Sequence, residues 1–121
     1  MKYLIDSNII IYHLNGDKSA TEFLSKNYQY LAISFISIIE VLSFDYSSTE
    51  RKVVNEFMSN FTRIDINDKI ISTAINLRLT KKIKLPDCII ASTALVNNAT
   101  LVTQNLKDFQ HIPELNIINT N

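Results

Sequence analysis

Cysteine, glycine, proline and net charge are all scarce in this chain of 121 residues. Its single cysteine cannot form a disulfide within the chain, and Cys88 lies in an apolar helical pattern that indicates a core residue and not a nucleophile. The 12 basic residues equal the 12 acidic ones, so overall charge gives no reason to expect tight non-specific binding to nucleic acid. No apolar run reaches the roughly 18 residues of a membrane span, and the start, MKYLID, lacks the apolar stretch of a secretory signal. We therefore expect one domain over residues 1–121, without a membrane segment, in the cytoplasm.

We predict the helices and strands from apolar periodicity and helix caps, because one glycine and two prolines mark few turns. The apolar pattern predicts strands at 2–6, 31–34, 61–65, 100–103 and 117–118. It predicts helices at 8–14, 19–26, 37–44, 47–60, 67–81 and 87–96. Ser19 and Ser47 each precede a glutamate by three residues, as in a capping box, and Asn67 can cap the following helix. Strands that alternate with helices indicate an α/β domain with a mainly parallel sheet.

Four acidic residues stand out because their surroundings in the sequence are apolar. Asp6 is the only charge between Lys2 and Asp17, and Glu40 the only one from residue 30 to 44. Asp87 is the only charge from residue 85 to 106, and Asp108 follows soon after. A carboxylate in apolar surroundings is costly unless something pairs with it or coordinates it. Four such residues suggest one shared cause, and a divalent cation is the simplest.

Each acid also has an ordinary explanation. Asp6 can cap the helix that follows it, and Asp87 can complement the dipole at a helix start. Asp108 can be a turn residue. Glu40 is the hardest to explain in this way, because its helical neighbours at four residues' distance, Ile36 and Phe44, are apolar and offer no salt-bridge partner. The helix at 37–44 is apolar nearly all round and is expected to be buried on several sides.

Topology gives a reason for the acids to converge. Asp6 ends the first predicted strand, and Asp108 follows a later one. Ligands of open parallel sheets bind beyond the carboxyl ends of the strands, where the strand order reverses. Carboxylates suit Mg²⁺ or Mn²⁺, whereas His13 and His111 lack the spacing of zinc ligands. Metal-assisted phosphodiester hydrolysis is the reaction class that such a site serves.

Four segments resemble the successive motifs of PIN-domain ribonucleases. They are LIDSN at 4–8, ISFISIIEVL at 33–42, LPDCIIASTAL at 85–95 and TLVTQNLKDF at 100–109. Their order and spacing look most like VapC-type toxins of bacterial toxin–antitoxin pairs. The resemblance implies a PIN-like three-layer α/β/α fold with a small, mainly parallel sheet. It also implies an endoribonuclease that hydrolyses RNA with water activated by Mg²⁺ or Mn²⁺.

The resemblance also assigns roles to single residues. Asp6, Glu40 and Asp87 match the three core acids of the family, which hold the metal and carry catalysis. Asp108 matches the acid of the last motif, where some members use the position held here by Asn105. The polar residue after the first acid and the hydroxyls before the glutamate match supporting positions, which are Asn8, Ser34 and Ser37. For the two serines, local backbone capping is an equal explanation.

Partners follow from the same resemblance. It implies an RNA substrate, a cognate antitoxin and a homodimer. Apolar side chains around the third helix would either supply the dimer surface or form a thick core against the sheet, and the sequence favours neither: Phe35, Ile36, Leu42, Phe44 and Tyr46. Relatives often carry a glycine before the LPD segment, where this chain has lysines, and Lys82 and Lys84 could contact RNA phosphates.

Three other functions compete with this interpretation. A haloacid-dehalogenase-type phosphotransfer enzyme would need a second aspartate two residues after Asp6, where the chain has Asn8. A receiver-type α/β signalling domain could use Asp65 as its phosphoacceptor, but it leaves Glu40 and Asp87 unexplained. A catalytically inactive PIN-fold binding module is the third alternative.

Overall fold

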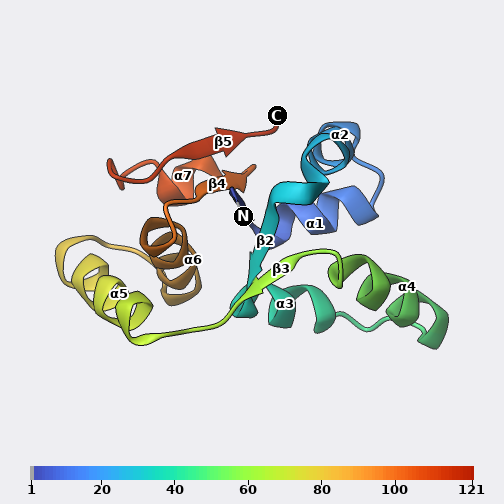
Figure 1. The fold of residues 1–121 in the computed structure, drawn as a ribbon, viewed down its shortest axis with the longest axis horizontal. Coiled ribbons are helices and arrows are strands. Elements are labelled where there is room, and N and C mark those ends of the chain that lie inside the picture. Colours follow the sequence, from blue (N-terminus) through green and yellow to red (C-terminus); the bar gives the residue numbers. More distant parts are fainter. Residues whose placement is uncertain (1) are drawn as a thin grey trace.

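A computed structural model describes residues 2–121, so Met1, with which the predicted domain begins, lies outside the described part. Its centre is a sheet of five strands: β1 (Tyr3–Ile5), β2 (Leu31–Ser34), β3 (Thr62–Ile64), β4 (Thr100–Thr103) and β5 (Ile117–Asn119). The strand order is β3-β2-β1-β4-β5, and every neighbouring pair is parallel (Figure 1). The predicted α/β fold with a small parallel sheet is therefore confirmed.

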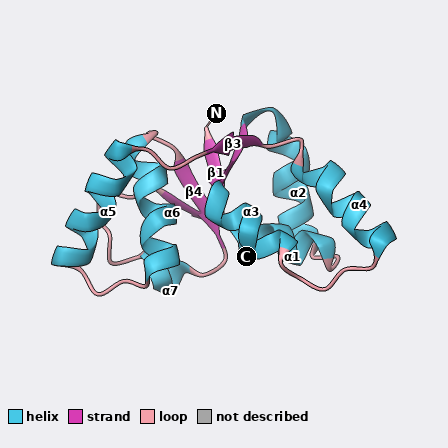
Figure 2. Cartoon of the chain, turned by 90° about the horizontal axis from the view of Figure 1, so that it is seen from below, coloured by secondary structure: helices cyan, strands magenta, loops and turns pink. Residues whose placement is uncertain are grey.

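Helices cover both faces of the sheet. They are α1 (Ser7–Leu14), α2 (Lys18–Asn27), α3 (Phe35–Leu42), α4 (Ser48–Met58), α5 (Asp68–Thr80), α6 (Leu85–Val96) and α7 (Leu106–Phe109), with a short 3₁₀ turn, η1 (Tyr28–Tyr30). Figure 2 shows α5, α6 and α7 on one side of the strands and α1, α2 and α4 on the other, with α3 between them. This arrangement is the expected three-layer α/β/α fold.

Successive side chains of the strands point to opposite faces of the sheet and divide the core into two halves. Leu4 and Leu101 pack under α5, α6 and α7, whereas Ile5 and Val102 pack under α1, α2 and α4. Successive side chains of a strand point to opposite faces, so short apolar strands can fill both halves. Cys88 is fully buried in the first half, and its thiol donates to the Ala74 carbonyl oxygen at 3.2 Å, which confirms it as a core residue.

Two of the three predicted helix caps are confirmed. The Ser47 hydroxyl accepts from the Glu50 amide at 3.1 Å, and the Glu50 carboxylate accepts from the Ser47 amide at 2.8 Å, which completes a capping box. Asn67 caps α5 by accepting from the Ile70 amide. The capping box at Ser19 is wrong, because α2 starts one residue earlier with Asp17 at its N-cap. The Ser19 hydroxyl instead donates to the Asp17 carboxylate at 3.2 Å.

The structure corrects the expected burial of α3. The helix begins at Phe35 and is capped by Ser34, whose hydroxyl accepts from the Ile36 amide at 3.3 Å. Only one side is buried, through Val41 and Ser37, while Ile39 is 58% exposed. Glu40 is exposed as well, so it is not a charge in an apolar interior. An apolar sequence all round a helix therefore did not mean burial all round.

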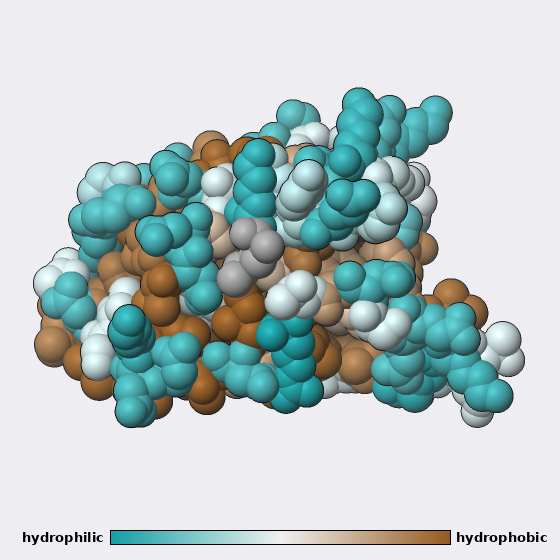
Figure 3. All heavy atoms as spheres, in the orientation of Figure 1, coloured by the Kyte–Doolittle hydropathy of each residue, from teal (hydrophilic) through white to brown (hydrophobic). Residues whose placement is uncertain are grey.

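An exposed apolar face runs along α5. Ile71, Ile75 and Leu79 follow one another at helical spacing and are 42%, 55% and 80% exposed. With Leu85 at the start of α6 they line an apolar hollow of about 380 Å³. Figure 3 shows hydrophobic atoms among hydrophilic ones at the left of the view, over α5. We call this surface the α5 face.

Of the described residues, no helix combines the length and apolar character that a membrane crossing requires.

Candidate active site

The sheet reverses its strand order between β1 and β4, and Asp6 lies at that point. Chain order runs outward from β1 through β2 to β3 on one side, and from β4 to β5 on the other. Asp6 follows β1 directly, and its amide donates to the Val102 carbonyl oxygen of β4 at 3.0 Å. Asp6 therefore lies beside Thr103, at the carboxyl ends of both strands. Such a switch point is where open α/β sheets bind their ligands.

The Asp6 carboxylate is buried and held by three donors. Its Oδ1 accepts from the Ser7 amide at 2.8 Å, while Oδ2 accepts from the Thr103 hydroxyl at 2.9 Å and from the Asn8 side-chain amide at 3.3 Å. Burial raises the pKa of Asp6 from 3.8 to about 6. The bonds from Thr103 and Ser7 oppose this rise, whereas the negative charges of Glu40 and Asp87 add to it. Asp6 is therefore the N-cap of α1, and burial disfavours the charged form of its carboxyl group.

Thr103 organises the polar groups around Asp6. Besides donating to Asp6, its hydroxyl accepts from the Asn8 side-chain amide at 3.1 Å and from the Asn105 backbone amide at 3.0 Å. The Asn8 carbonyl oxygen accepts in turn from the Gln104 backbone amide at 3.4 Å. Asn8 therefore lies where a supporting residue was expected. Thr103 and Gln104 were not predicted, although their position at the end of a strand in the motif TLVTQN was a usable signal.

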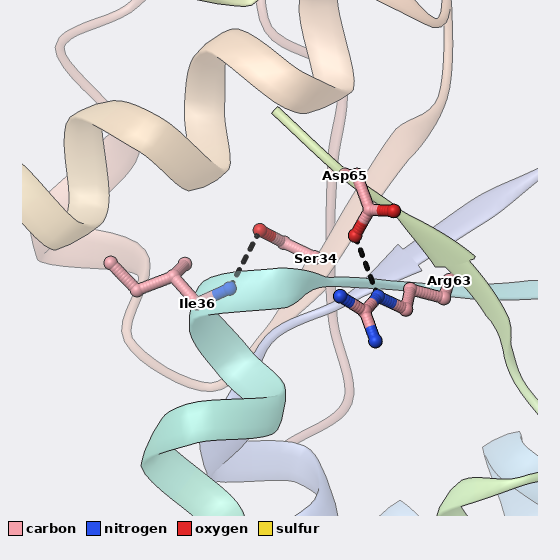
Figure 4. A network of polar contacts seen from close by, with 4 residues as sticks. All are labelled: Ser34, Ile36, Arg63 and Asp65. Atoms are coloured by element: carbon pink, nitrogen blue, oxygen red, sulfur yellow. Dashed lines mark hydrogen bonds and ion pairs between the residues drawn. The ribbon is translucent and has the colours of Figure 1, made fainter. Parts of the chain in front are cut away.

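Glu40 reaches the same region from α3. Its Oε1 accepts from the Ser7 hydroxyl at 3.1 Å, and the Ser7 backbone amide donates to Asp6. One residue therefore joins both acids. The two serines before Glu40 behave differently: Ser34 caps α3 (Figure 4), while the fully buried Ser37 hydroxyl has no hydrogen-bond partner among the described residues.

Asp87 and Asp108 meet in a hollow beside this region. Asp87 is half-buried in the first turn of α6, directly after Pro86, and Asp108 is half-buried on α7. Burial raises the pKa of Asp87, and the charges of Asp108 and Glu40 raise it further, while Lys84 opposes them. Both acids line a hollow of about 430 Å³ together with five other residues: Lys82, Ile83, Lys84, Lys107 and His111.

The four acids are close enough for their charges to affect one another, but they do not surround a single point. Asp6 senses the charges of Glu40 and Asp87, and Asp87 senses those of Glu40 and Asp108. In residues 2–121, no three Asp, Glu, His or Cys side chains form a ready metal-binding cluster. The donor set itself consists of hard oxygen ligands and fits Mg²⁺ or Mn²⁺.

The receiver-type alternative does not fit the topology. Asp65 follows the edge strand β3, which is separated from β1 by β2. It is exposed and accepts from the Arg63 guanidinium at 2.6 Å (Figure 4). A phosphoacceptor would have to lie beside the acids at the end of β1, and Asp65 does not.

Comparison with known proteins gives a consistent result. The family model of the PIN domain matches residues 3–115. Ribonuclease VapC2 of Rickettsia felis is 36% identical, with 95% of this chain and 95% of that protein covered. Among solved structures, a toxin–antitoxin complex from Klebsiella pneumoniae has 32% identity and a TM-score of 0.88, with 99% of this chain and 98% of that chain covered. VapBC2 from Rickettsia felis, bound to a DNA fragment from its promoter, has 30% identity and a TM-score of 0.85, with 98% of each covered.

Proposed function

Because the chain belongs to the PIN-domain family, and within it to the VapC type, we propose that it is an endoribonuclease toxin that uses Mg²⁺ or Mn²⁺ to hydrolyse RNA phosphodiester bonds. The observation that carries this proposal is that Asp6 lies at the switch point of the sheet and that Ser7 donates to both Asp6 and Glu40. The negative charge of Asp87 is close enough to raise the pKa of Asp6. The relative from Rickettsia felis is named a ribonuclease. The reaction class therefore has support from both the site and the relative.

The proposed metal ligands are Asp6, Glu40, Asp87 and Asp108. A divalent cation held there lowers the pKa of water and stabilises negative charge on a phosphate. Asp108 is the better fourth ligand, because it lines the same hollow as Asp87 and its charge raises the pKa of Asp87. Asn105 is exposed and uses its backbone amide to hold Thr103, which suits a supporting role.

The residues around Asp6 prepare its carboxylate for a cation. Hydrogen bonds from Thr103, Asn8 and the Ser7 amide fix its two oxygens, so the carboxylate loses little orientational freedom when an ion binds. The raised pKa means that protons compete with the cation below about pH 6. We expect Ser34 to act indirectly by setting the start of α3, and Ser37 to support the site with its free hydroxyl.

A cognate antitoxin and a second copy of the chain are the proposed protein partners. Two solved structures similar to this chain are toxin–antitoxin assemblies.

The expected dimer surface needs correction, because Phe35, Ile36, Leu42 and Tyr46 are half-buried and only Phe44 is exposed. The α5 face now gives the homodimer its main support, since exposed apolar patches often mark interfaces. Sedimentation that shows only monomer at high concentration would count against it. We expect the protein to act in the cytoplasm, where its proposed RNA substrate is found.

A circular RNA cleavage assay tests the proposed activity. Purified protein with Mg²⁺ or Mn²⁺ should linearise a structured, circularised RNA, and chelator should stop the reaction because it removes the cation. Circular RNA has no ends, so only an endonuclease can cut it. No cleavage across a broad set of RNAs would instead favour the inactive binding module.

A further inference from the structure

Four basic side chains surround the hollow that Asp87 and Asp108 share. Lys82 and Lys84 come from the segment before α6, whereas Lys107 and His111 come from α7 and the turn after it. We call these four residues the basic rim. Two segments about 25 positions apart in the sequence thus build one concave wall, as a binding site requires.

The positive charges of the rim are only partly offset within the protein, because Lys84 acts on Asp87 without forming an ion pair with it. Among residues 2–121 the one ion pair joins Arg63 to Asp65, so Lys82, Lys84 and Lys107 make none. Three ammonium groups already exceed the two carboxylates of the hollow. A cation on the acids would leave the hollow more positive still. In a chain whose formal charge is zero, this local excess indicates an anionic ligand.

We propose that the basic rim binds an RNA phosphate beside the one that is cleaved, with Lys107 and His111 as contact residues in addition to Lys82 and Lys84. This inference rests on the proposed function, which makes RNA the ligand. Lysine binds phosphate as a point charge, and an imidazole N–H can donate to a phosphate oxygen. Lys107 and Asp108 are consecutive on α7, so RNA that reaches the acids also passes the rim.

RNA binding without cleavage tests the rim. A labelled single-stranded RNA is titrated with the whole protein in chelator, at several salt concentrations, and fluorescence anisotropy reports the affinity. Each lysine contact contributes about 0.7 to the slope of log affinity against log salt. Lys107→Ala should therefore lower the slope by about 0.7 and weaken binding about fourfold at 0.15 M salt. The double variant with Lys82→Ala and Lys84→Ala should lower the slope about twice as much. His111→Ala should weaken binding with a smaller change in slope, because a hydrogen bond is lost.

Two matched variants keep the test specific. Lys107→Arg retains the charge and should retain the slope. Lys52→Ala removes the same charge from an exposed position on α4, across the sheet from the rim, and should change neither affinity nor slope. Lys107 and His111 are exposed, so their variants should fold, which thermal unfolding checks.

The outcomes separate the rim from the activity. If the wild-type protein cuts RNA but Lys107→Ala and His111→Ala bind RNA as tightly and with the same salt slope, the rim is not a phosphate site, while the nuclease stands. If the wild-type protein neither binds nor cuts RNA, the proposed function fails and the rim inference fails with it. A loss as large in Lys52→Ala would also overturn the inference, since general charge would then explain the binding.

Discussion

Replacing Asp6 by asparagine should reduce RNA cleavage about a thousandfold or more and, at the same time, make the folded protein more stable at pH 7. The loss follows because an amide is a poor ligand for a hard cation, and no other acid occupies the same place at the end of β1. The gain follows because Asp6 is buried and its pKa is raised to about 6.

The direction of the pH effect can be worked out from that pKa. Between pH 3.8 and about 6 the folded protein keeps a proton on Asp6 that the unfolded chain has released. Folding stability therefore falls as the pH rises through this window, by up to about 3 kcal/mol. Asparagine carries no charge and removes the fall, although it replaces the hydrogen bonds from Ser7 and Thr103 only in part. We expect a net gain of about 1–2 kcal/mol at pH 7.

Two measurements on one variant check this prediction: the cleavage rate in Mn²⁺, and urea unfolding in chelator from pH 4 to 7. Asp45→Asn serves as the control, because it removes the same charge from an exposed position after α3 and should change neither quantity much. Unchanged cleavage by Asp6→Asn would remove Asp6 from the site. A loss of stability at pH 7 would show that the N-cap hydrogen bonds of Asp6 stabilise the fold by more than the burial of its charge destabilises it.

Phe109→Ala should destabilise the protein by about 3–5 kcal/mol, a large share of the stability of a domain of this size. Phe109 is fully buried among the side chains that pack under α5 and α6, and α7 is only four residues long. So short a helix is not stable by itself, and this aromatic ring fixes it to the core. Because Lys107 and Asp108 precede Phe109 directly, cleavage should also fall in the protein that remains folded.

Urea unfolding measures the stability change, and the neighbouring Leu106 provides the control. It lies on the same helix and is 38% exposed, so Leu106→Ala should cost far less than Phe109→Ala. A loss below about 1 kcal/mol for Phe109→Ala would mean that α7 is anchored by other contacts.

The elements of this fold were readable from the sequence because its helices and strands are short and well patterned. Of the elements within residues 2–121, all five strands and six of the seven helices were expected near their observed places. The exception, α7, has four residues, which is too few for a period to show. The error at α3 has a different cause: apolar side chains can fill a core or cover a surface that another molecule would bury, and a single sequence does not distinguish the two.

The site was less readable, because it depends on the order of strands. Apolar surroundings correctly indicated that Asp6 is buried, but they misled for Glu40, which is exposed. Thr103 was missed although it holds Asp6: its position at a strand end was a usable signal, but its contact with Asp6 follows only once β4 is placed beside β1. Lys107 and His111 likewise gain meaning only when α7 is brought next to α6.

Manganese binding, measured by calorimetry at pH 7, tests most directly whether these distant acids form one metal site. The wild-type protein should take up Mn²⁺, and Asp87→Asn and Glu40→Gln should each lose most of that affinity while remaining folded. Uptake should also weaken as the pH falls below about 6, where Asp6 holds its proton. No uptake by the wild-type protein, or equal uptake by all three proteins, would contradict a shared metal site at the switch point of the sheet.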